Sequence, residues 1–245
     1  MSWILLTAAV LIAIGYAWRH VEERSGGFRR CAQRRNLRLC RPDPSDLDHR
    51  YAGSVILRLG HSRRIGLTLS GTHELGAWTA FLHTCDLGFG ADRICVRRGI
   101  AASDVDAGVN AVCLPTAVAE NEDNPLRTPM GYTAMTLVAR PVGDTASGAV
   151  ALRPTSHALF VQRPSAAQHP SARRLIDIAS RYPADWVWEA GGSFLMVASE
   201  KAATGQEMAE LLDAVADAAR ALHRSNDANP APGPGSCRSP IRFTA

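Results

Sequence analysis

Sixteen consecutive residues without a charge, from Trp3 to Trp18, lie close to the N-terminus of this 245-residue chain. A helix from Met1 to Trp18 would rise about 27 Å at ~1.5 Å per residue, close to the ~30 Å hydrocarbon core of a bilayer. Trp3 at one end, and Tyr16 with Trp18 at the other, stand where interfacial aromatic residues anchor such helices. The sequence therefore predicts a transmembrane helix over residues 1–18.

Two alternatives to this helix stay open. Gly15, Tyr16 and Ala17 form an acceptable cleavage site for a secretory signal peptide, although the preceding residues lack the usual Lys or Arg. A buried core helix is the other alternative, although eight Arg residues following an entirely apolar first helix would be an unusual arrangement.

A dense Arg cluster follows the apolar run, while the rest of the chain is slightly acidic. Residues 1–41 carry eight Arg against Glu22 and Glu23, whereas residues 42–245 carry 19 basic and 21 acidic residues. The positive-inside rule then predicts a single-pass protein of the cell membrane with the bulk of the chain in the cytoplasm. The cluster is also expected to face anionic lipid, unless it only sets the topology. It comprises Arg19, Arg24, Arg29, Arg30, Arg34, Arg35, Arg38 and Arg41.

The remaining chain divides into a basic juxtamembrane connector at 19–50, an α+β cytoplasmic domain at 51–224 and a disordered tail at 225–245. Pro42 and Pro44 end any helix in the connector, and Pro, Gly and Ser dominate the tail. Within the domain, 51–59 and 63–70 are predicted to pair as a hairpin, with further strands at 93–98, 109–115, 132–141 and 157–164. Residues 74–85 fit either a strand or a short helix.

The last third of the domain has the clearest pattern. An amphipathic helix is expected between Ser171 and Pro183, and Gly191-Gly192 is the turn of a hairpin. Thr204 and Glu207 form a capping box. It opens a helix with one apolar stripe, which consists of Met208, Leu211, Leu212, Val215, Ala219 and Leu222. The predicted fold class is α+β, with an N-terminal transmembrane helix, a β-rich domain, a closing hairpin and a C-terminal amphipathic helix.

This order of parts resembles uncharacterised single-pass membrane proteins of GC-rich bacteria. The resemblance rests on residues 1–41 and on 184–224, where a Trp-bearing hairpin precedes the amphipathic helix. It implies location and architecture, and it brings no catalytic residues with it.

Motifs for catalysis or cofactor binding are absent from the sequence. The single Lys, Lys201, precedes Ala202, so there is no phosphate-binding loop of the Walker type. No Gly-x-Ser-x-Gly elbow occurs, and Gly88-Phe89-Gly90 is interpreted as a loop. Four metal-capable residues, His73, His83, Cys85 and Cys95, have spacings unlike those of structural zinc sites. We expect no cofactor and no metal, and we interpret these four residues as buried Cys and hydrogen-bonded His side chains rather than as metal ligands.

From these observations we expect a membrane-tethered cytoplasmic domain with an interaction or accessory role. Its partner would be a membrane protein, and an enzymatic role is not favoured. A membrane-proximal enzyme with a Cys/His or Ser/His site is the first alternative, for which Cys85 or Cys113 could serve. An extracytoplasmic ligand-binding domain is the second, if the topology is reversed. Nucleic acid is not expected as a partner, because residues 42–245 lack an excess of positive charge.

Overall fold

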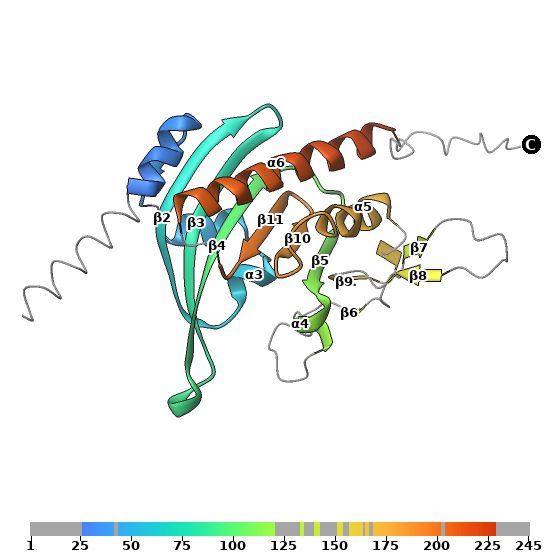
Figure 1. Ribbon diagram of the computed structural model, residues 1–245, viewed down its shortest axis with the longest axis horizontal. Helices are drawn as coiled ribbons and strands as arrows, with labels where there is room; N and C mark the ends of the chain where they lie inside the picture. The colour runs from blue at the N-terminus through green and yellow to red at the C-terminus, as the bar shows by residue number, and fades with distance from the viewer. Residues whose placement is uncertain are drawn as a thin grey trace, which may run out of the picture.

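The protein is described by a computed structural model that covers residues 26–41, 44–120, 133–134, 140–142, 151–153, 157–163, 165–166, 169–201 and 204–228 (Figure 1). Nine strands form one antiparallel sheet in the order β1-β2-β3-β4-β11-β10-β5-β9-β6. They are β1 (Arg38–Cys40), β2 (His61–His73), β3 (Gly76–Leu87), β4 (Ile94–Asp104), β5 (Asn110–Pro115), β6 (Thr133–Ala134), β9 (His157–Val161), β10 (Val187–Gly191) and β11 (Phe194–Ser199). A separate pair joins β7 (Arg140–Val142) to β8 (Ala151–Arg153).

Helices cover both faces of this sheet. They are α2 (Pro44–Arg50), α3 (Val55–Arg58), α4 (Thr116–Glu120), α5 (Pro170–Ala179) and α6 (Gly205–Ala228), and residues 26–34 are also helical. Figure 1 shows α5 and α6 across one face and α3 behind the sheet. The β-rich α+β class expected from the sequence agrees with this architecture.

Alternation along the strands produces the two cores. Ala80, Leu82 and Ala101 pack with the apolar stripe of α6, whereas Phe81 and Ile100 pack with Tyr51 and Ile56 on the opposite face. Because both faces are covered, the central strands are buried on both sides and are apolar at most positions rather than at alternate ones. Every residue of β11 is accordingly buried.

The predicted closing elements are confirmed. Strands β10 and β11 pair around a turn in which Gly192 has a φ of +73°, a conformation that glycine adopts at little cost. The capping box is formed as expected, since Glu207 N donates to Thr204 Oγ1 at 3.3 Å and Thr204 N donates to Glu207 Oε2 at 2.8 Å. Helix α6 continues to Ala228, beyond the start of the predicted tail.

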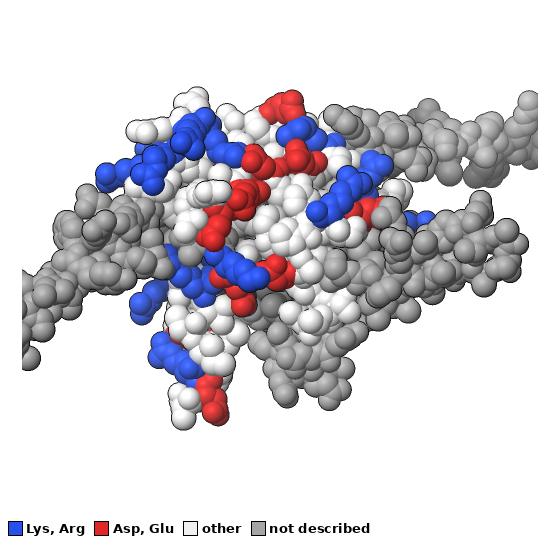
Figure 2. Space-filling model, in the orientation of Figure 1, with Lys and Arg blue, Asp and Glu red and all other residues white. Residues whose placement is uncertain are grey.

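The transmembrane helix in the predicted fold class is wrong and has to be corrected. In the part of the chain that the structure describes, no helix is both long enough and apolar enough to cross a membrane. The longest of the described helices, α6, has the length, but Glu210, Asp213 and Asp217 give it an exposed charged side (Figure 2), and charges in a bilayer are costly. Residues 1–18 themselves lie outside the described residues. The single-pass membrane assignment, and the cytoplasmic placement that depended on it, are therefore withdrawn.

Part of the predicted connector belongs to the folded core. Phe28 is fully buried between the sheet and the N-terminal end of α6, and β1 pairs with β2. Arg35 forms an ion pair with Asp213 of α6. The sequence pattern emphasised the charges in this segment, whereas Phe28, Cys31 and Ala32 on its opposite side are the residues that fix its place.

The segment 51–59 was predicted as a strand, and this prediction is wrong. Ser54 instead caps the short helix α3, accepting a hydrogen bond from Leu57 N at 3.2 Å. Gly53, with φ +101°, reverses the chain just before it. The β-branched residues that suggested a strand point their apolar groups onto the sheet instead, because tertiary contacts outweigh β-propensity in so short a segment.

Glu189 on β10 attaches this helix to the sheet. Its carboxylate is completely buried and accepts hydrogen bonds from Ser54 Oγ at 2.7 Å, Val55 N at 2.7 Å and Ile56 N at 3.1 Å. Burial raises the pKa of Glu189, and these hydrogen bonds partly offset that increase. A buried polar group without such partners would cost about 1–3 kcal/mol.

Glu189→Gln is expected to lower the free energy of unfolding by about 1–3 kcal/mol, because an amide N–H would face backbone N–H donors of α3. Urea denaturation monitored by tryptophan fluorescence measures this change. Gln162→Glu, an exchange of the same pair of residue types at an exposed position, is the control and should change stability by less than about 0.5 kcal/mol. Equal stabilities for wild type and Glu189→Gln would show that the carboxylate does not hold α3.

Leu212→Asp tests the core beneath α6. Leu212 is fully buried in the cluster that joins α6 to the sheet, so an unpaired carboxylate there should cost about 3 kcal/mol or more. The neighbouring Asp213→Ala removes a half-exposed ion pair with Arg35 and should cost no more than about 1 kcal/mol. Thermal unfolding by circular dichroism compares the two, and similar midpoints for both variants would contradict this assignment of faces.

Candidate functional site

The four metal-capable residues of the sequence are not brought together. His83 and Cys85 do share one face of β3, as expected for an extended strand, and both are buried. Cys95 pairs in register with Asp86, so it points to the opposite face from Cys85. His73 lies at the other end of the sheet, in β2. Within the described ranges, no three His, Cys, Asp or Glu side chains are arranged to hold a metal ion.

The electrostatics of these residues are the reverse of what a Cys/His nucleophile needs. Burial raises the pKa of the Cys85 thiol, and it also raises the pKa of the fully buried Cys113. Burial, with the nearby cations Arg98 and Arg63, lowers the pKa of His83 to about 4. Thiol and imidazole are therefore both neutral at pH 7, whereas a reactive cysteine is stabilised as the thiolate.

A Ser/His contact is present, but its geometry does not activate the hydroxyl. His73 Nε2 lies 2.9 Å from Ser103 Oγ, and Leu75 N donates to His73 Nδ1 at 3.3 Å. A neutral ring that accepts at Nδ1 carries its proton on Nε2, so His73 donates to Ser103. A histidine that acts as general base must instead accept the proton of the serine hydroxyl. Ser103 is also fully buried. The contact connects β2 to β4 and does not prepare a nucleophile.

His83→Leu tests the buried imidazole through pH. Because folding depresses the pKa of His83 from its ordinary 6.5 to about 4, the unfolded chain binds more protons between these values, and stability is lost as the pH falls through this window. Asp48, Arg63 and Arg98 are the charged groups acting on this ring. His83→Leu should remove this component of the acid sensitivity, measured as the difference in unfolding free energy between pH 7 and pH 4. An unchanged difference would mean that His83 stays neutral in the unfolded chain or charges in the folded one.

The predicted basic cluster is only partly within the described residues, since Arg19 and Arg24 lie outside them. Arg29, Arg30 and Arg34 are on the helical segment 26–34, Arg38 is in β1 and Arg41 follows it. Arg35 is bound by Asp213, which leaves it less available to lipid. Contact of the cluster with anionic lipid, like the expectation that nucleic acid is not a partner, stays a prediction.

A feature that the sequence analysis missed is the projecting hairpin tip, residues 87–95 between β3 and β4. In Figure 1 it extends away from the helices that cover the rest of the sheet. Among the described residues, the exposed large hydrophobic side chains are Phe89 and Ile94, with 78% and 64% of their surface accessible. Phe89 stacks on His61 with ring centroids 4.5 Å apart.

Glycines on both sides of Phe89 shape this tip. Gly88 and Gly90 have φ of +71° and +62°, and a Cβ at Gly88 would lie 2.6 Å from Asp92 O. The turn therefore requires glycine at 88. The Gly88-Phe89-Gly90 triplet is the sequence signal that could have indicated this site. The backbone of the turn explains the two glycines but does not explain the large aromatic residue between them.

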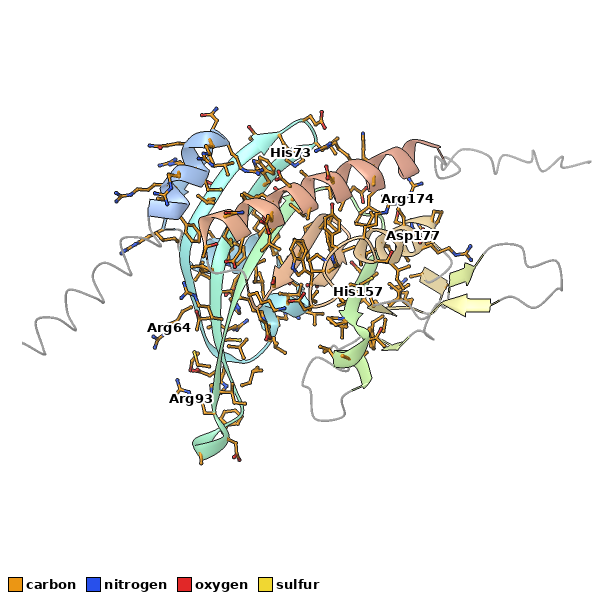
Figure 3. The ribbon with its side chains drawn as sticks, in the orientation of Figure 1. Arg64, His73, Arg93, His157, Arg174 and Asp177 are labelled. Carbon is orange, nitrogen blue, oxygen red and sulfur yellow. The ribbon has the colours of Figure 1, made fainter. Side chains whose placement is uncertain are left out.

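Arginine side chains lie in and next to the projecting hairpin tip. Figure 3 shows Arg64 and Arg93 along the same outer side of the hairpin, with Arg93 nearer its end. Arg93 donates to Asp86 at 2.5 Å and keeps more than half of its own side chain exposed. Its guanidinium lowers the pKa of Asp86. Within the tip Arg93 stands beside Asp92, and Arg64 and Arg97 both lie in register with Thr84, three residues before Leu87.

Two open cavities lie at the other end of the strands. One, of about 690 Å³, is next to the start of α5 and is lined by Asn110, Gln162, Arg163 and His169. The other, of about 950 Å³, lies by the β2–β3 turn; we call it the acidic cleft. Its lining includes Glu74, Leu75, Asp104, Val105 and Asp106.

Comparison with known proteins finds no matching family model, no matching curated protein and no matching solved structure. The resemblance to single-pass membrane proteins of GC-rich bacteria therefore stays a prediction, and functional inference depends on the geometry of this chain.

Proposed function

We propose that this chain is an interaction or accessory domain that docks onto a protein partner through the projecting hairpin tip. The observation that carries the proposal is the exposure of Phe89 and Ile94 at the end of a hairpin that reaches beyond the rest of the sheet. Aromatic and Arg side chains are the residues most enriched at the energetic centres of protein interfaces, and the tip presents both.

The residues expected for catalysis support an enzymatic role less well than the tip supports an interaction role. Cys85, Cys113 and Ser103 are buried. Burial raises the pKa of both thiols, and Ser103 Oγ accepts a hydrogen bond from His73 rather than donating one to it. An interaction role needs only an accessible surface of suitable chemistry, and the tip supplies one.

Photocrosslinking from position 89 tests this function. With p-benzoylphenylalanine in place of Phe89, which keeps an aromatic side chain, illumination of cells that contain the full chain should give one dominant protein adduct, identified by mass spectrometry. Adding Ile94→Ser should reduce its yield severalfold, because the apolar contact is shared between the two side chains.

The matched control carries the same photoreactive residue at Gln33, an exposed position on the helical segment 26–34. It should not yield that adduct. Absence of a protein adduct from position 89, an identical adduct from position 33, or transfer of the label to lipid instead of protein would each overturn the proposed function.

A further inference from the structure

We infer that the partner of the projecting hairpin tip is a second copy of this chain, and that the tip enters the acidic cleft of its neighbour. This inference rests on the proposed function and names its partner. Because the donor and acceptor surfaces differ, the contact is heterologous, and repetition adds chains head to tail.

The positions of the two surfaces suit such an arrangement. Strand β4 connects the two surfaces. Its first residue, Ile94, belongs to the tip, and its last residue, Asp104, lines the acidic cleft. Figure 1 shows the β2–β3 turn, which lines the cleft, at the end of the sheet remote from the tip. A chain therefore cannot fill its own cleft with its own tip, and both surfaces are available to neighbours.

The two surfaces are also complementary in chemistry. The tip has an apolar centre, Phe89 and Ile94, beside arginines. The cleft has apolar lining from Leu75 and Val105 beside three carboxylates. An apolar centre with oppositely charged surroundings is the usual arrangement of a specific interface.

The three carboxylates have partners within the chain, and these do not remove them from solvent. Glu74 lies 3.4 Å from Arg220 and Asp104 lies 2.5 Å from Arg50, yet 67% and 39% of the two carboxylate side chains stay accessible. Asp106 accepts a hydrogen bond from Gly108 N and is exposed. Exposed ion pairs of this kind exchange partners at little cost, so the incoming arginines of a tip can compete for them.

The volume of the cleft fits the proposed occupant. About 950 Å³ of open space is at the upper end of the range for cavities that enclose whole small ligands, and it accommodates an aromatic side chain with its neighbours on a tight turn. A hairpin tip buries less surface than a standard interface, so we expect weak, concentration-dependent association.

Sedimentation velocity of the purified full-length chain tests the inference. Wild type should form larger species as its concentration rises from about 1 µM to about 1 mM, the range in which weak interfaces associate. Phe89→Ser, which disables the tip, and Glu74→Arg, which repels the arginines in and next to the tip from the cleft, should each raise the dissociation constant at least about tenfold. Glu210→Arg, a charge reversal at an exposed carboxylate elsewhere on the chain, should associate like wild type.

Mixing the two variants gives the decisive result. Phe89→Ser keeps an intact cleft and Glu74→Arg keeps an intact tip, so an equimolar mixture should form a dimer that grows no further, although each variant alone is monomeric. Thermal unfolding must show both variants to be folded, and Asp106→Arg replaces Glu74→Arg if the latter is not.

Two outcomes would overturn the inference: a wild type that stays monomeric throughout, or two variants that do not form the mixed dimer. Photocrosslinking from position 89 separates this failure from that of the proposed function. An adduct with a different protein would overturn self-association and leave the docking role of the tip standing, whereas no protein adduct at all would overturn both.

Discussion

Burial of both faces of a single antiparallel sheet is the constraint on which the rest of this structure depends. Helix α6, α5 and the helical segment 26–34 cover one face, while in the described part of the chain the short helices α2 and α3 cover the middle of the other. So short a helix as α3 has little stability of its own. The completely buried Glu189 compensates, because it satisfies the first N–H groups of α3 and ties them to a central strand.

The same constraint explains where the candidate site lies. Strands β3 and β4 have 12 and 11 residues, which is longer than β5, β10 or β11. The β3–β4 hairpin extends away from the covering helices (Figure 1). Among the described residues no helix covers the far end of this hairpin, so Phe89 and Ile94 are exposed by the length of the hairpin rather than by a defect in packing.

Local patterns predicted the C-terminal part of the fold well, because its elements depend on neighbouring residues. The turn at Gly192, the Thr204–Glu207 capping box and the apolar stripe containing Leu212 each lie within a short stretch of sequence, and all three are present. The prediction of a strand at 51–59 was wrong because α3 depends on Glu189, which is more than 130 residues away in the sequence. The membrane assignment depended on one apolar run. It is contradicted because none of the described helices is long and apolar enough to cross a membrane. The tip was missed because exposure depends on the relative lengths of strands, which no local pattern records.

Phe89 contrasts with the other large apolar residues of the chain. Burying a Phe side chain contributes about 1.5–3 kcal/mol, and Phe28, Phe81 and Phe194 are all buried in the cores that cover the sheet. Phe89, at 78% exposure, obtains little of this contribution and also increases the risk of unspecific association. Neither the turn nor the sheet requires an aromatic residue at this position, since Gly88 and Gly90 provide the turn. Stabilisation of the folded chain therefore does not account for Phe89, whereas the proposed docking of the tip would bury its ring in the surface of another molecule.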